Sequence, residues 1–210
     1  MDKSREKERV RVEVAPDAAA PAAKKTPLWK NHRAAVAIVA AVCVVMTAFG
    51  AHRSVRAQRS AVERAFYQGT DGTGYSISRL LGDRVEYAGY LVKVASQYPE
   101  LTDAADAVAT AAGELQSAKG AEAGGEANRA LTDAVTALDL AMQSAALAEK
   151  DEQYRSEYTA NLTGCNLKIS HMMPEYNDLA QQFNDGTLGA FPLGTLARLT
   201  GVKPAEEYHG

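Results

Sequence analysis

The feature that most constrains this chain is a run of apolar and small residues near its N-terminal end. Residues 34–51 carry no charged side chain, Arg33 directly precedes them, and His52 and Arg53 follow. Eighteen residues span about 27 Å as an α-helix, which approaches the hydrocarbon thickness of a bilayer. The run therefore predicts a single-pass transmembrane helix whose partner is the lipid bilayer of the cell membrane.

A cleaved secretory signal is the alternative interpretation of the same run. Such a signal has a short basic start, a shorter apolar stretch and a small-x-small cleavage site, which Ala48, Phe49 and Gly50 would supply. However, 33 residues, many of them charged, precede this run. The pattern favours an uncleaved anchor.

Charge is distributed unevenly on the two sides of the run. Residues 1–33 hold nine Lys/Arg against five Asp/Glu, whereas residues 52–210 hold fourteen against twenty-one. Because the basic tail is the harder part to move across a membrane, we expect residues 1–33 to be a disordered charged tail on the inside and the following domain to be extracytoplasmic. The acidic domain also argues against a nucleic-acid partner, which would require a basic face.

Apolar residues return at three- and four-residue steps from residue 77 onward, and no long stretch alternates apolar and polar residues. This period is typical of helices that bury one stripe. Helices are expected over residues 77–98, from residue 102 to about 115, and from 127 to 142, with Gly120, Gly124 and Gly125 forming a turn before the third. The expected fold is all-α, with an antiparallel bundle of three to four long helices over residues 76–208.

The fourth predicted helix has the clearest pattern. Its apolar residues alternate four- and three-residue spacings, as in a coiled coil, and Pro174 within it predicts a kink. A short C-terminal helix follows Phe191 and Pro192, with Leu193, Leu196 and Leu199 expected to return to the core. The seam of the fourth helix consists of Tyr158, Leu162, Cys165, Ile169, Met172, Tyr176, Leu179 and Phe183.

Residues 52–75 connect the anchor to the bundle. Val55, Val62 and Phe66 predict a juxtamembrane helix, which the glycine-rich sequence GTDGTG at residues 69–74 would end. This sequence has neither the Lys-Ser/Thr of a P-loop nor the spaced ligands of an EF-hand. A linker is the expected role of residues 69–74.

The C-terminal residues resemble a known family. YNDLAQQFN at residues 176–184, Phe191-Pro192, and LARLTGVKPAEEY at residues 196–208 are similar to the C-terminal signature of the LemA family. Arg84 and YLVKVASQY at residues 90–98 look like a weaker form of that family's first long helix. The resemblance implies a membrane-anchored antiparallel helical bundle with no established enzymatic activity. Asn166, Leu167 and Met173 stand where the family has a Glu-Asn pair and an Arg, so a polar cluster of the family is missing.

Tyr176, Asn177, Phe183 and Asn184 form the candidate interaction face. The two asparagines lie seven residues apart, on one face of the predicted helix. Their amides would either bind a peptide or partner strand, or hydrogen-bond neighbouring elements and fix helix register. The structural role is the favoured alternative.

No residue pattern indicates a reaction. The four histidines are scattered and have no Cys or carboxylate at metal-ligand spacing, and motifs of hydrolases and metalloproteases are missing. The sequence thus predicts no catalytic, cofactor-binding or metal-binding residue, and a non-enzymatic protein.

Two functional hypotheses follow for such a chain. The first is a protein-interaction or scaffolding module at the membrane surface, with an unidentified protein partner or a second copy of itself. The second is an extracytoplasmic bundle that binds a small ligand between helices and passes a signal to a membrane partner. An enzyme is the least favoured class.

Overall fold

The computed structural model describes residues 32–70 and 74–210, and within these residues all regular structure is helical. The expected all-α fold, with an N-terminal apolar helix followed by a bundle, is confirmed. Most of the predicted tail, residues 1–31, and part of the glycine-rich segment, residues 71–73, lie outside the described residues. The elements in chain order are α1 (His32–Gln68), α2 (Ile77–Ala95), η2 (Pro99–Leu101), α3 (Thr102–Ser117), α4 (Ala121–Ser144), α5 (Glu149–Gln181), η3 (Gln182–Thr187) and α6 (Leu193–Leu199).

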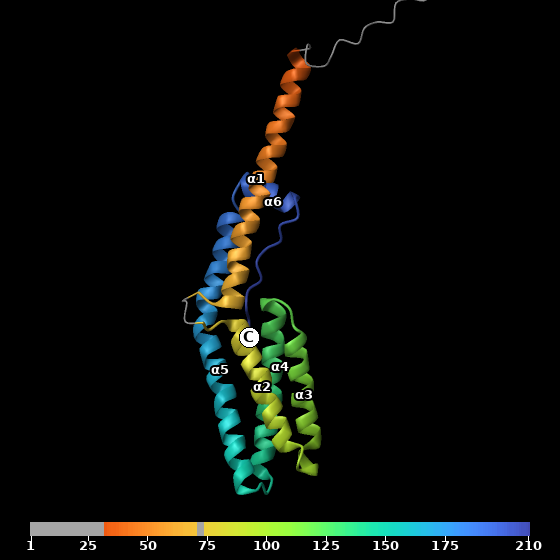
Figure 1. Cartoon of the computed structure of the whole chain (residues 1–210), viewed down its shortest axis with the longest axis vertical. Helices are drawn as coiled ribbons and strands as arrows, with labels where there is room; N and C mark the ends of the chain where they lie inside the picture. The colour runs from red at the N-terminus through yellow and green to blue at the C-terminus, as the bar shows by residue number, and fades with distance from the viewer. Residues whose placement is uncertain (1–31, 71–73) are drawn as a thin grey trace, which may run out of the picture. The chain divides into compact units, whose positions relative to one another are not determined.

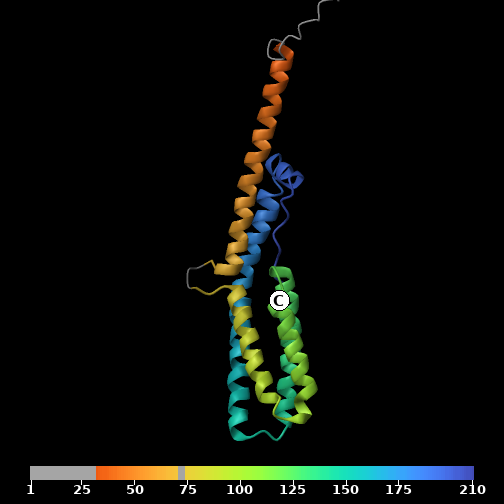
Figure 2. The same ribbon diagram turned by 45° about the vertical axis from the view of Figure 1, so that its right-hand side comes forward.

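The chain divides into two units, residues 1–43 and residues 44–210. In the second unit α2, α3, α4 and α5 run alternately down and up, so that neighbouring helices are antiparallel (Figures 1 and 2). The long helix α5 extends beyond this four-helix region, where the second half of α1 lies beside it in both views. The antiparallel bundle therefore contains four long helices and receives a contribution from α1.

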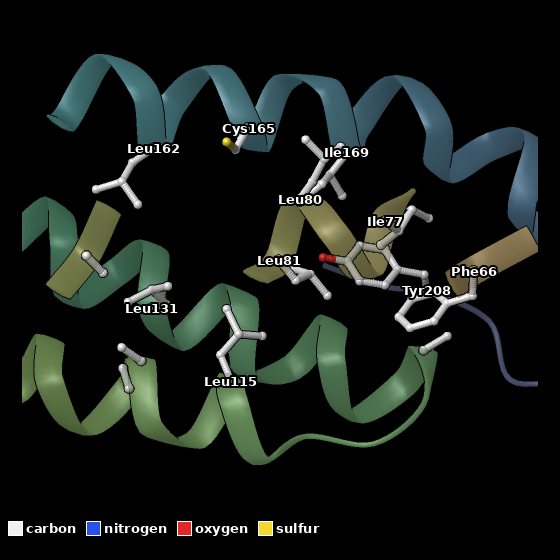
Figure 3. Close-up of a cluster of buried hydrophobic side chains, with 14 of the residues drawn as sticks. Phe66, Ile77, Leu80, Leu81, Leu115, Leu131, Leu162, Cys165, Ile169 and Tyr208 are labelled. Carbon is white, nitrogen blue, oxygen red and sulfur yellow. The ribbon is translucent and has the colours of Figure 1, made fainter. Parts of the chain in front are cut away.

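Aliphatic and aromatic side chains fill the space between these helices (Figure 3). Leu80 and Leu81 of α2, Leu131 of α4 and Ile169 of α5 are all buried in one apolar cluster. Burial of a leucine or isoleucine side chain contributes about 1.5–3 kcal/mol each, which makes this cluster the main source of stability. The predicted seam is confirmed for Leu162, Cys165, Ile169, Tyr176 and Phe183, which are buried, whereas Tyr158, Met172 and Leu179 are half-buried.

Residues 52–68 belong to the bundle as well as to the connection. Val55, Val62 and Phe66 are buried in the same apolar cluster as the bundle helices. The ring of Phe66 lies 5.6 Å from that of Tyr176, centroid to centroid. The helix that contains the apolar run thus continues directly into the packed core.

Two details of the sequence-based expectation were wrong. Gly124 and Gly125 were expected in a loop between helices, but both are buried residues inside α4, near its start. Of the three glycines, only Gly120 has the positive φ of a loop residue. Leu193 and Leu199 were expected in the core, but they are 50% and 80% exposed. Pro174 lies inside α5, which continues to Gln181, and the kink expected there stays a prediction.

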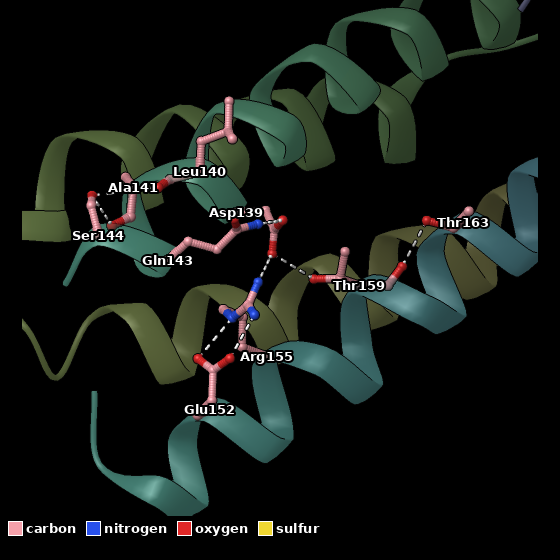
Figure 4. Close-up of polar contacts among 9 residues, drawn as sticks. All are labelled: Asp139, Leu140, Ala141, Gln143, Ser144, Glu152, Arg155, Thr159 and Thr163. Carbon is pink, nitrogen blue, oxygen red and sulfur yellow. Dashed lines mark hydrogen bonds and ion pairs between the residues drawn. The ribbon is translucent and has the colours of Figure 1, made fainter. Parts of the chain in front are cut away.

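A polar network joins the end of α4 to the start of α5 (Figure 4). Arg155 donates to Asp139 Oδ1 at 2.5 Å and to both carboxylate oxygens of Glu152, at 2.6 and 2.9 Å. Thr159 donates to the same Asp139 oxygen at 3.2 Å. Hydrogen bonding to Arg155 lowers the pKa of Glu152. A guanidinium that binds two carboxylates in this way holds the two helix ends in one register.

Candidate functional site

The predicted interaction face lies at the end of α5 and in η3. Tyr176 and Phe183 are buried, whereas Asn177 and Asn184 are half-buried. The described contacts of the two asparagine amides are with the chain's own C-terminal segment, residues 202–208. We call this segment the strap.

Each asparagine forms a two-point amide pair with the backbone of the strap. Asn184 Oδ1 accepts from the Ala205 N–H at 2.7 Å and its Nδ2 donates to the Ala205 carbonyl at 3.0 Å. Asn177 forms the same pair with Tyr208, at 2.8 and 2.9 Å. Between the two pairs, the Tyr176 hydroxyl donates to the Glu206 carbonyl at 2.8 Å. The face therefore binds an extended peptide, and that peptide is its own chain.

The spacing of the two asparagines follows from the geometry of helix and extended chain. Seven residues of α-helix rise about 10.5 Å, and three extended residues span about 10 Å. Asn184 pairs with Ala205 and Asn177 pairs with Tyr208, so the strap runs antiparallel to α5. The distance between asparagines seven residues apart on a helix is thus close to the distance between residues three apart in an extended peptide.

The strap ends in the core of the bundle. Tyr208 has no exposed surface, and its ring lies 6.4 Å from that of Phe66. Its side chain projects among Ile77, Leu80 and Leu81 of α2 (Figure 3). Burial raises the pKa of both Tyr208 and Tyr176 to about 12. Tyr208, two residues before the last residue of the sequence, is therefore a core residue that only the tertiary fold brings into the apolar cluster.

Glu206 links the strap to the start of α4. Its Oε2 accepts from the Ala121 N–H at 3.0 Å, one of the amides that a helix N-terminus leaves unpaired. Gly120 precedes this amide with a φ of +89°, and a Cβ there would overlap the Glu206 carboxylate. Beside it lies an open cavity of about 230 Å³ between α1, α4, α5 and the strap, lined by Glu63, Phe66, Tyr67, Tyr176 and Glu206 among others.

Replacing Glu206 by alanine is expected to lower the free energy of unfolding by about 1 kcal/mol, because an N-terminal amide loses its acceptor and the helix dipole loses a favourable charge. Chemical denaturation measures this change. Glu207 is the matched control, since its carboxylate lies 3.6 Å from His209 on the same segment and not at a helix N-terminus. An equal loss in Glu207→Ala would contradict the role of Glu206 at α4.

Arg84 is the buried charge of the bundle. It is 2% exposed, donates to Thr132 Oγ1 at 2.8 Å and to the Leu162 carbonyl at 3.4 Å, and has no carboxylate within ion-pair distance in the described part of the chain. Desolvation by burial lowers its pKa. Arg84 thereby joins α2 to α4 and α5. In the sequence, Arg84 stands within the apolar stripe of α2, between Leu81 and Ala88, and this position indicates a buried arginine.

Other polar groups do not gather into a reactive constellation among the described residues. No group of three or more His, Cys, Asp or Glu lies close enough to hold a metal ion in that part of the chain. Cys165 is buried in the α5 seam, and burial raises the pKa of its thiol. A thiol in this setting packs as a small apolar side chain.

Comparisons with protein-family models, with curated proteins and with solved structures find no match to this chain. Its function is therefore inferred from its own residues and their arrangement.

Proposed function

We propose that this chain is a single-pass membrane protein whose helical bundle acts as a non-enzymatic interaction or scaffolding module at the membrane surface. The observation that carries the proposal is the exposure of the apolar run. Helix α1 is the one described helix with the length and hydropathy to cross a bilayer, and its large apolar side chains between residues 36 and 49 are all at least 50% exposed. Lipid is the environment that would cover such side chains.

A surface of four tyrosines supports the interaction role. Tyr87 and Tyr90 of α2 adjoin Tyr154 and Tyr158 of α5, with Tyr90 and Tyr158 5.5 Å apart and Tyr154 and Tyr158 stacked at 5.8 Å between centroids. Tyr90 is exposed, and the other three are half-buried. Tyrosine is enriched at the centres of protein interfaces because it offers a large apolar area together with a hydroxyl. We call these four residues the tyrosine surface.

The LemA-like pattern supports the same proposal. The residues that carry the resemblance, at positions 176–184 and 196–208, supply the paired asparagines and the strap. A face that fixes the chain's own C-terminal end makes a rigid platform, as a scaffold requires. We propose membership of the LemA family on this basis.

The interaction role is tested by purifying the full chain from membranes in mild detergent after cross-linking. The expected result is a specific protein partner, or a second copy, that is recovered with the wild type and lost with Tyr90→Ala/Tyr158→Ala. Tyr67→Ala is the matched control, because Tyr67 is exposed on α1 outside the tyrosine surface. Recovery of no specific protein, or equal loss with the control, would contradict the proposal.

We further propose that the bundle faces the extracytoplasmic side. Cysteines introduced at Ser4 and Lys150, in a Cys43→Ser/Cys165→Ala background, report the two sides of the membrane in intact cells. An impermeant thiol reagent is expected to label residue 150 and not residue 4. Labelling of residue 4 alone would place the bundle in the cytoplasm.

A further inference from the structure

The segment that carries α6 exposes large apolar side chains that the sequence pattern assigned to the core. Phe191 is 86% exposed, Leu199 is 80% exposed and Leu193 is 50% exposed. We call these three residues the α6 tip. Single apolar residues on a surface are ordinary, whereas several in one short segment are a feature of interaction sites.

Other residues of the same segment are firmly held. Leu188, Ala197 and Val202 are buried. Thr187 Oγ1 hydrogen-bonds Gln58 Oε1 at 2.7 Å, which ties the segment to α1. Gly194 packs so closely that a Cβ there would overlap the Leu188 carbonyl. The α6 tip is therefore presented outward by a fixed base.

The position of α6 along α1 is the decisive observation. His52 Nδ1 lies 2.8 Å from Thr200 Oγ1, and His52 is the first residue after the uncharged run. Ala51, the last residue of the run, is buried. Both ribbon views show α6 beside α1 (Figures 1 and 2). The tip thus lies at the level where the apolar run gives way to charged residues.

The residues near the contact between His52 and Thr200 are more basic than the rest of the domain. Residues 186–205 contain Arg198 and Lys203 and no Asp or Glu. Residues 52–62 of α1 contain three arginines, of which Arg59 pairs with Glu63 at 3.2 Å. Arg53, Arg198 and Lys203 each lie within three positions of the residues in the His52–Thr200 contact, in a domain that is acidic as a whole. Basic residues at such a level are attracted to anionic headgroups.

We propose that the α6 tip is a second membrane contact, which inserts Phe191, Leu193 and Leu199 into the interfacial region of the bilayer that α1 spans. Interfacial segments of this kind bury apolar side chains about 5–10 Å into the headgroup and acyl boundary, with basic residues at the phosphates. Arg198 and Arg53 occupy the corresponding level here. The contact would fix the rotation and tilt of the bundle above the membrane.

A second copy of the chain is a weaker candidate for the same surface. A stable protein interface buries about 800 Å² on each partner, which is far more than three side chains offer. The bilayer needs no such area, because α1 already holds the tip beside it. The inference rests on the proposed membrane anchoring by residues 34–51.

The test is depth-dependent tryptophan quenching in the full chain. Trp29, the single native tryptophan, is replaced by Phe, and one tryptophan is introduced at Leu199, Leu140 or Val44. Each protein is reconstituted at high lipid-to-protein ratio into phosphatidylcholine/phosphatidylglycerol vesicles containing lipids brominated at a shallow or a deep acyl position. Leu140 is the matched control, since it is 61% exposed on α4 of the bundle.

The expected result is blue-shifted emission for Leu199→Trp with stronger quenching by shallow than by deep bromines, and no quenching for Leu140→Trp. Quenching of Val44→Trp reports the anchor separately. If Val44→Trp is quenched and Leu199→Trp behaves like Leu140→Trp, the second contact is wrong and the anchor stands. Blue-shifted emission at residue 199 without lipid quenching would assign the tip to a second copy. If Val44→Trp is not quenched, the anchor fails and the contact at the tip fails with it.

Discussion

Replacing Asn177 and Asn184 together by alanine is expected to release the strap and to lower the free energy of unfolding by about 4 kcal/mol. The two amides make four hydrogen bonds to the strap backbone, each of which contributes about 1 kcal/mol net. Asn177 lies in α5 and Asn184 in η3, and each amide makes two of the four bonds. Each single variant should therefore lose about 2 kcal/mol. Because both amides hold the same strap, the difference between the double variant and the sum of the single variants measures their coupling.

Amide hydrogen exchange separates release of the strap from a general loss of stability. The Ala205 and Tyr208 amides should lose protection in the double variant, because their acceptors are the two asparagine side chains. Gln181→Ala is the matched control, since it removes an exposed amide from the same helix. Unchanged protection at Ala205 and Tyr208 would show that the asparagines do not hold the strap.

Replacing Tyr208 by alanine is expected to cost about 3–5 kcal/mol, the range for removing a large aromatic side chain from a core. Tyr208 has no exposed surface and closes the end of the bundle against Phe66 and Leu81. Tyr208→Phe should cost far less, because it keeps the ring and removes only a hydroxyl from which the neighbouring Asn128 side chain lies outside good hydrogen-bond geometry. Chemical denaturation of the two variants measures the difference. Equal losses in both would show that the hydroxyl, and not ring packing, stabilises the fold.

The same variants give a pH signature. Burial raises the pKa of Tyr208 from an ordinary value of 10.0 to about 12, so the folded state holds the phenol proton more tightly than the unfolded state. The stabilisation is complete below pH 10 and is lost as the pH rises from 10 to 12. Tyr208→Phe should lose stability less steeply over this interval. Tyr176, whose pKa is also raised to about 12, retains its own contribution in that variant.

The spacing of apolar residues in the sequence predicts much of the helical framework. The seam of α5 was predicted from alternating four- and three-residue steps, and Leu162, Cys165, Ile169 and Tyr176 are buried as expected. The apolar helix at the N-terminal end needed only the uncharged run, because helix formation satisfies its backbone hydrogen bonds within one segment. The spacing of apolar residues is enough to predict a helix when the backbone hydrogen bonds of that helix form within the same segment.

The glycines of α4 show where local pattern misleads. Three glycines in six residues predict a turn, yet a Cβ at Gly125 would lie 3.0 Å from the backbone of His209 and Gly210, and a Cβ at Gly124 would lie 3.3 Å from Leu81. The absence of side chains here lets residues 209–210 and α2 approach the helix, and of the three only Gly120 has the positive φ of the predicted turn. A glycine in a sequence is compatible both with a loop and with close helix packing. Here residues distant in the chain, such as His209 and Gly210 beside Gly125, decide which of the two it is.

The candidate site was also predicted only in part from the sequence. The paired asparagines were identified from their seven-residue spacing, but their binding partner was not, because nothing local states that residues 205–208 return as an extended peptide along α5. Leu193, Leu196 and Leu199 likewise follow three-residue steps, and this spacing is the same whether or not the core covers them.

The sequence by itself determined the apolar helix, the all-α class, the α5 seam and the acidic character of the domain, since each depends on residues close together in the chain. Only the tertiary structure decided that Tyr208 is a core residue, that the asparagines hold the strap and that the α6 tip lies level with His52. Those features are contacts between residues more than 20 positions apart, and such contacts depend on how the helices pack and not on any local period.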